Sequence, residues 1–309
     1  MSDRYTIEKL DIKKHGNGLW NLWQTVSSKY PGGVYWYHGD TNKQWENVFV
    51  CLDGDKLIGK GQVMVMCEQP YEAPSYAENR IFYNIRVLPE YERVDDVLDQ
   101  LYDAVHSRAV EIRKSFSNHK CQLCVGNSVN EIIYNEFALK KGDKEHNSLY
   151  FMSAPINLIK QYSYNGEDSA ITFREFSLAT KEAKEQYLRE LEWKCFTDDI
   201  MDMQRLLRYM DSDFFMVYGA FDGDKLIGAV MVDQDGDDIP EIESVSVLEQ
   251  YRGKHYAKIM IGKVMDLLSE KGCEKVKLTV FTSNESAIGL YRNLGFNIDK
   301  EEKRFMKYI

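Results

Sequence analysis

The chain has 309 residues, of which 44% are hydrophobic and 13% aromatic, so it has enough apolar surface to fold and is long enough for two domains. A formal net charge of −10 excludes a broad nucleic-acid-binding surface and favours basic partners such as amines. The charged start lacks a secretory core segment and no uncharged apolar run reaches membrane-spanning length, so we expect a cytoplasmic protein without a membrane partner.

Three segments of the first half predict small structural units in chain order. Residues 47–65 hold two apolar runs joined by Asp-Gly, which predicts a hairpin because glycine accepts the positive φ of a tight turn. Residues 85–105 predict a strand that enters a helix. Residues 121–143 predict a strand, a helix and a turn that ends on glycine.

The cysteines lie scattered through apolar stretches, and we expect them to be reduced, buried thiols: Cys51, Cys67, Cys121, Cys124, Cys195 and Cys273. Cys121 and Cys124 form a C-x-x-C pair. No second pair or histidine cluster follows that pair, and its segment is typical of a strand. We therefore expect no metal site.

The second half repeats these units in the same order. The matching pairs of segments are 47–65 with 215–232, 85–105 with 245–265, and 121–143 with 276–296. Such self-similarity indicates an internal duplication. A polar, turn-rich segment, 161–170, separates the copies and is the predicted linker, so we expect domains at 1–165 and 166–309.

The order of elements in the second half predicts an α/β fold (α+β, with a mixed sheet). The expected elements are a strand from Ile171, two amphipathic helices within 179–210, the hairpin, a strand at 241–247, a helix at 253–270, a strand at 275–281, a helix at 285–293 and a strand at 304–309. We expect each domain to be a mixed, mostly antiparallel sheet flanked by helices.

The segment from Val245 onward predicts an anion site. A strand, a turn that contains Gly253 and a helix follow one another, and a helix start presents free backbone N–H groups and the positive end of the helix dipole. Arg252 and Lys254 add positive charge, and glycine lets a ligand approach the backbone. A pyrophosphate would fit this site. The same pattern is also typical of an ordinary strand-to-helix turn with solvated basic residues.

A second motif covers the last predicted helix. Asn284 stands at the helix start, and Gly295 stops the helix. Ala287, Leu290 and Tyr291 lie at helical spacing between them. Tyr291 is either a functional phenol or a core aromatic residue.

In this order and at this separation, the two segments resemble the GCN5-related N-acetyltransferase (GNAT) family. Residues 250–255, with the sequence QYRGKH, match the family's Q/R-x-x-G-x-G/A pyrophosphate loop, and residues 284–296 match its second coenzyme A motif. His255 departs from the pattern, because glycine or alanine is usual at that position. The sequence therefore leaves the backbone conformation of the loop at His255 undecided.

The resemblance implies acetyl-coenzyme A as the acetyl donor and a primary amine as the acceptor, on a small molecule or on a protein. It implies direct transfer in a ternary complex, with Tyr291 protonating the departing thiolate. Val245, Ser246 and Val247 would pair with the pantetheine arm, and residues 252–257 would hold the pyrophosphate. The residues implied in coenzyme binding are Val245, Ser246, Val247, Gln250, Arg252, Gly253, Lys254, His255, Tyr256, Ala257, Asn284, Ala287, Leu290 and Tyr291.

Transfer to an amine needs a base, since an ammonium cannot attack a thioester. Glu241 and Glu243 share one face of the predicted strand at 241–247, and some family members carry a glutamate base on that strand. A solvated strand face explains both residues equally well. Asp198 and Asp199, between the two predicted helices, are alternative acids for the acceptor pocket.

The first repeat lacks both motifs. Its counterpart of the pyrophosphate loop places Glu92, Asp95 and Asp96 at a helix start, where they would repel a phosphate. Phe137 and Ala138 stand where the second half has Leu290 and Tyr291. The first half therefore resembles a degenerate GNAT repeat, and the chain is a pseudo-dimer whose oligomeric state stays open.

Two classes of function remain in view. One is a GNAT-type N-acetyltransferase. The other is a non-catalytic acyl-coenzyme A sensor or interaction module with the same fold. The second half keeps both the loop and Tyr291, and this favours the enzyme.

Overall fold

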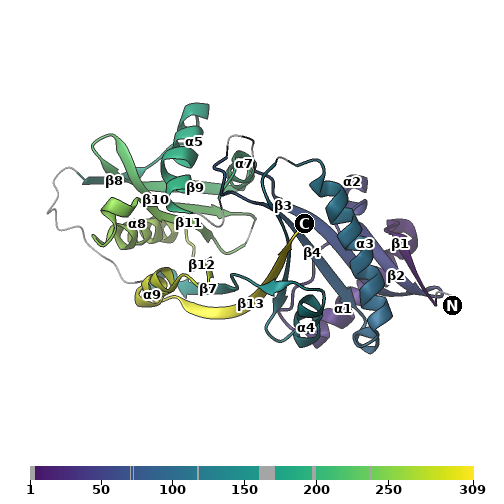
Figure 1. Cartoon of the computed structure of the whole chain (residues 1–309). Helices are drawn as coiled ribbons and strands as arrows, with labels where there is room; N and C mark the ends of the chain where they lie inside the picture. Colours follow the sequence, from purple (N-terminus) through teal and green to yellow (C-terminus); the bar gives the residue numbers. More distant parts are fainter. Residues whose placement is uncertain are drawn as a thin grey trace. The chain divides into compact units, whose positions relative to one another are not determined.

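The computed structural model of the chain describes residues 4–69, 71, 73–116, 118–159, 171–196, 200–236 and 238–309. The chain forms two compact units, Met1–Ser148 with Glu301–Ile309 and Leu149–Lys300 (Figure 1). Each unit has its own hydrophobic core. The predicted linker and the predicted boundary at 165/166 lie outside the described residues.

The first unit is a sheet that helices cover. Its elements are β1 (Tyr5–Lys9), α1 (Ile12–Lys29), α2 (Asn42–Trp45), β2 (Val48–Asp53), β3 (Lys56–Cys67), β4 (Asn79–Val87), the 3₁₀ turn Pro89–Tyr91, α3 (Asp95–Arg113), β5 (Cys121–Ser128), α4 (Ile132–Lys140), β6 (Lys144–Glu145) and the end of β13 (Asn297–Tyr308). The strand order is β1-β2-β3-β4-β5-β13, and β6 pairs with β13. The β4/β5 pair is parallel, and the others that make up this sheet are antiparallel.

The second unit repeats this plan. Its elements are β7 (Leu149–Pro155), the 3₁₀ turn Ile156–Leu158, β8 (Ile171–Glu175), α5 (Lys181–Tyr187), the π turn Leu188–Glu192, α6 (Trp193–Cys195), α7 (Met203–Met210), β9 (Phe214–Asp222), β10 (Lys225–Gln234), β11 (Glu241–Val247), the 3₁₀ turn Glu249–Tyr251, α8 (Tyr256–Glu270), β12 (Lys275–Phe281) and α9 (Glu285–Leu294). The strand order is β7-β12-β11-β10-β9-β8. Only the β11/β12 pair is parallel among the described pairs of this sheet.

The predicted fold class is confirmed, because both sheets are mixed and mostly antiparallel. The duplication is visible in side-chain detail as well. The Tyr91 hydroxyl donates to Asp53 at 3.0 Å in the first unit, and the Tyr251 hydroxyl donates to Asp222 at 2.7 Å in the second. Both aspartates open the Asp-Gly hairpin turns, which supports two copies of one ancestral unit.

The division into units differs from a single cut near residue 165. Strand β7 pairs antiparallel with β12 from Lys275↔Pro155 to Phe281↔Leu149, although it precedes the predicted linker. Residues 302–308 pair antiparallel with β5. Each segment covers a sheet edge whose backbone groups would otherwise stay unpaired.

All six cysteines are free thiols. Four are buried, as predicted, whereas Cys195 and Cys273 are partly exposed. Within the described ranges, no helix combines the length and the apolar character that crossing a membrane requires.

Candidate functional site

Two neighbouring strands diverge in the second unit. Within the described residues, β11 pairs with β12 only at Glu241↔Lys277 and Ile242↔Leu278. The backbone groups of residues 244–247 that face β12 therefore do not join a ladder with it. A bulge marks β11 as well: Met231↔Ser244 is followed by Val232↔Ile242, so Glu243 is the extra residue. A bulge re-aims side chains, and bulges are common next to active sites.

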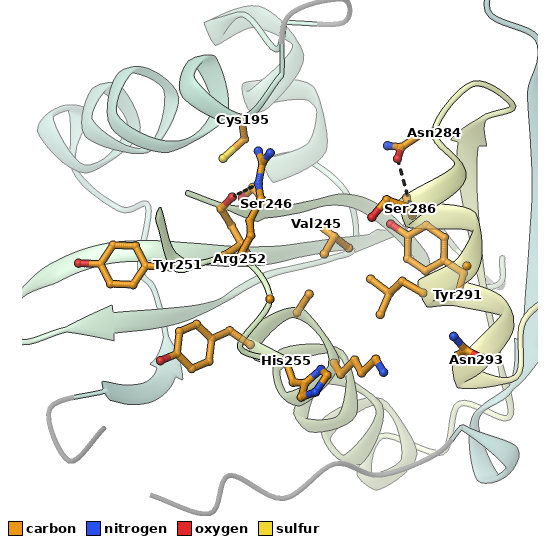
Figure 2. Close-up of a pocket in the computed structure, with 18 of the residues that line it drawn as sticks. Cys195, Val245, Ser246, Tyr251, Arg252, His255, Asn284, Ser286, Tyr291 and Asn293 are labelled. Carbon is orange, nitrogen blue, oxygen red and sulfur yellow. Dashed lines mark hydrogen bonds between the residues drawn. The ribbon is translucent and has the colours of Figure 1, made fainter. Parts of the chain in front are cut away.

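A cavity of about 660 Å³ lies at this divergence (Figure 2). It is lined by β11, the turn after it, the start of α8, residues along α9, and by Cys195 and Phe196. The predicted coenzyme-binding residues that line it are Val245, Ser246, Val247, Arg252, Gly253, His255, Tyr256, Ala257, Asn284, Ala287, Leu290 and Tyr291. Gln250 and Lys254 are not among its lining residues. The structure thus brings both predicted motifs to one cavity.

The turn before α8 has the backbone shape that its glycine predicts. Gly253 has a φ of 81°, and His255 has a φ of 65° at the N-cap of α8. The His255 side chain forms no cap hydrogen bond, and the first turn of any helix leaves N–H groups without intrahelical partners. His255 thus adopts the left-handed conformation, which glycine adopts without strain and which costs another residue about 1 kcal/mol.

Arg252 ties this turn to the strand. Its Nε donates to the Val247 carbonyl at 3.0 Å, and its guanidinium lies beside the Cys195 thiol (Figure 2). Burial, with the Glu192 carboxylate, raises the pKa of Cys195 to about 11, although Arg252 opposes the shift. The thiol is therefore protonated at neutral pH. A ligand that pairs with this carbonyl would either share it with Arg252 or displace Arg252.

Tyr291 forms part of the opposite wall. Its side chain is 8% exposed and projects from α9, whose start Asn284 caps by accepting from the Ala287 N–H at 3.1 Å (Figure 2). The ring packs edge-on against Phe296. Burial raises the pKa of Tyr291 above its ordinary value, so the phenol keeps its proton at any physiological pH.

The two candidate bases occupy different environments, and neither lines the cavity. Glu241 accepts from Thr279 at 3.1 Å and forms an ion pair with Lys277 at 3.3 Å. Burial, together with the charges of Glu241 and Asp233, raises the pKa of Glu243 to about 7, against opposing effects of Tyr209 and an arginine. Glu243 lies two positions before Val245 along the strand, a Cα–Cα distance of about 7 Å. Asp198 and Asp199 lie outside the described residues.

The equivalent groove of the first unit is filled by its own side chains. Tyr134 precedes Gly142 by the same number of residues as Ala287 precedes Gly295. Its hydroxyl accepts from the Val87 N–H at 3.1 Å, on the strand that corresponds to β11. The buried Arg86 guanidinium lies over the Tyr134 ring at 4.4 Å. A ligand that pairs with β4 would have to displace this tyrosine.

Acidic groups also replace the basic turn in the first unit. Glu92 stands where the second unit has Arg252, and it is buried with Lys29, at 2.5 Å, and the Tyr30 hydroxyl as partners. Asp95 and Asp96 open α3. These carboxylates disfavour a phosphate at this turn.

Sequence reasoning missed several residues near the cavity. Cys195 and Phe196 line it, and Asp233 and Tyr209 contact Glu243. They come from three separate elements and match no motif. The alignment of the two repeats gives one indication of a functional role for Asp233. It aligns with Met64, an apolar residue of the first repeat, which lacks the coenzyme motifs.

Comparison with known proteins matches this geometry. Residues 185–296 match the model of a protein family that is described as the acetyltransferase (GNAT) family. An acetyltransferase of Yersinia pestis (strain Pestoides F) is 30% identical over 101 residues, 33% of this chain and 69% of that protein. A mycothiol acetyltransferase of Corynebacterium efficiens is 32% identical over 100 residues, 31% of this chain and 34% of that protein. The second unit thus has the sequence of an acyltransferase domain.

Solved structures show the same fold across both units. A GCN5-related N-acetyltransferase from Sphaerobacter thermophilus covers 100% of this chain and 96% of its own, with a TM-score of 0.68 at 14% identity. A tandem GNAT protein from the clavulanic acid biosynthesis pathway covers 98% of each chain, with a TM-score of 0.59 at 11% identity. The chain belongs to the acetyltransferase (GNAT) family and is an acyltransferase with two tandem units.

Proposed function

We propose that the second unit transfers the acetyl group of acetyl-coenzyme A to a primary amine, most simply that of a small molecule. The observation that carries this proposal is the cavity at the divergence of β11 and β12, which reaches from the basic turn to Tyr291. The side of residues 245–247 that forms no ladder with β12 suits an extended pantetheine arm, which would add to β11 as a short strand. The start of α8 suits the pyrophosphate.

The proposed reaction is direct attack in a ternary complex. A substrate ammonium gives one proton to Glu243 through water, and the neutral nitrogen attacks the thioester carbonyl carbon. Backbone N–H groups of β11 stabilise the oxyanion. The carbon–sulfur bond then breaks, the thiolate takes a proton from Tyr291, and the phenol recovers one from the acylated nitrogen. One proton in total reaches solvent.

The environments of the two glutamates favour Glu243 as the base. Its pKa of about 7 lets it bind and release a proton near neutrality. Glu241 is already committed to Lys277 and Thr279.

Kinetics with an amine panel test the proposal, and thiol release is the signal. We expect Glu243→Gln and Tyr291→Phe to lower turnover about 100-fold while coenzyme A binding, measured by calorimetry, stays unchanged. Glu241→Gln is the matched control and should stay within a few-fold of wild type. Tight coenzyme binding without turnover on any amine would identify an acyl-coenzyme A sensor, and absence of coenzyme binding would refute both functions.

A further inference from the structure

Asp233 brings a second carboxyl group to Glu243. Asp233 lies near the end of β10, directly opposite Glu241 in the antiparallel ladder. The bulge at Glu243 turns this extra residue toward the same place, and the carboxyl groups of Asp233 and Glu243 lie within hydrogen-bonding contact. Asp233 Oδ1 is buried and has no hydrogen-bond partner among the described residues.

Charged groups on the neighbouring elements lie near the Asp233–Glu243 pair. Glu241 on β11 and Asp235 beyond β10 add negative charge, and Lys277 on β12 adds positive charge. On α7, the Tyr209 hydroxyl bonds to Glu243, and Arg205 Nε donates to that hydroxyl at 2.9 Å. Lys277 forms its ion pair with Glu241. The charge of Lys277 on Asp233 and that of Arg205 on Glu243 act against the rise in the pKa of each carboxyl group, which burial and the neighbouring carboxylates cause.

Two carboxyl groups in hydrogen-bonding contact cannot both ionise without strong repulsion, and a single proton between them removes that repulsion. We propose that Asp233 is a positioning residue that shares one proton with Glu243 and thereby sets the pH range in which Glu243 accepts the proton of the acceptor amine. This inference rests on the proposed function in assigning Glu243 as the base. The shared proton itself depends on geometry alone.

A pH profile of kcat/KM for the amine tests the effect on catalysis. Asp233→Asn keeps the shape of the side chain and removes its negative charge, so the acid limb should move to lower pH by about one unit. The KM for acetyl-coenzyme A should not change. Asp235→Asn, which removes an exposed negative charge outside the carboxyl pair, is the control and should move the limb much less. An unmoved limb in Asp233→Asn would overturn the inference.

Thermal melting of the full chain tests the shared proton without catalysis. A carboxyl whose folded pKa is raised stabilises the fold at pH 5 and loses that contribution as pH rises through about 7. Removing the neighbouring charge reduces this loss of stability. The difference in melting temperature between Asp233→Asn and wild type should therefore shift by about 3 °C in favour of the variant from pH 5 to pH 8. An equal difference at both pH values would contradict the pair, whatever Glu243→Gln does to turnover. If the melting difference appears and Glu243→Gln retains full turnover, the pair stands and the assigned base is wrong.

Discussion

Lys60 is a buried cation in the first unit, and its removal gives a sharp test of the energetics. Its side chain is fully buried, its Nζ donates to the Trp36 carbonyl, and it lies 4.5 Å from the centre of the Tyr35 ring. No carboxylate of the described residues forms an ion pair with it. Burial, together with the nearby Arg86, lowers the pKa of Lys60 from 10.5 to about 7.

The size of the effect follows from that pKa. The folded chain binds the Lys60 proton more weakly than the unfolded chain, so folding stability rises with pH between about 7 and 10.5. At about 1.4 kcal/mol for each tenfold change in proton affinity, the buried amine costs about 4 kcal/mol at pH 7 and about 2 kcal/mol at pH 9. Lys60→Met removes this cost and loses one hydrogen bond of about 1 kcal/mol. We expect the variant to be more stable than wild type, and by about 2 kcal/mol more at pH 7 than at pH 9.

Urea unfolding of the full chain at both pH values measures this difference. Lys56→Met is the matched control, because Lys56 is half-exposed on the same strand and forms an ion pair with Glu90. The control should change stability by less than about 1 kcal/mol and without this dependence on pH. A Lys60→Met chain that is less stable than wild type, or equally shifted at pH 7 and pH 9, would refute the reasoning.

Four further predictions concern the proposed site. The rate of amine acetylation should fall to half its maximum as the pH is lowered to about 7, because Glu243 must be ionised. A rate that stays constant down to pH 5.5 would exclude Glu243 as the base. Calorimetry should give one coenzyme A per chain, since Tyr134 fills the first groove, whereas two equivalents would show that groove to be open. Ala287→Tyr places a tyrosine in the second unit at the position that Tyr134 occupies in the first. It should weaken coenzyme A binding at least about tenfold, whereas Ala287→Gly should keep the affinity. His255→Gly should stabilise the fold by about 1 kcal/mol in urea unfolding, and a loss of stability would show that the imidazole outweighs the backbone strain.

Local patterns in the sequence predicted much of the candidate site. The positive φ of Gly253 and the Asn284 cap are requirements of one turn and of one helix end, so consecutive residues encode them. The spacing from Ala287 to Tyr291 placed both residues on the face of α9 that lines the cavity. The choice between Glu241 and Glu243 was not predictable in this way. It depends on Lys277, Thr279, Asp233 and Tyr209, which come from other elements.

The sequence by itself determined that the chain contains two related α/β units and that only the second keeps the two coenzyme motifs. Periodicity, turn residues and internal repetition are local properties, and they survive in the order of the residues. Only the tertiary structure decided that β7 joins the second unit and residues 301–309 the first, because sheet edges are closed by strands that are distant along the chain. It also decided that Tyr134 closes the first groove and that Asp233 meets Glu243. The first contact joins residues 47 positions apart. The second depends on the bulge in β11, which no spacing rule predicts.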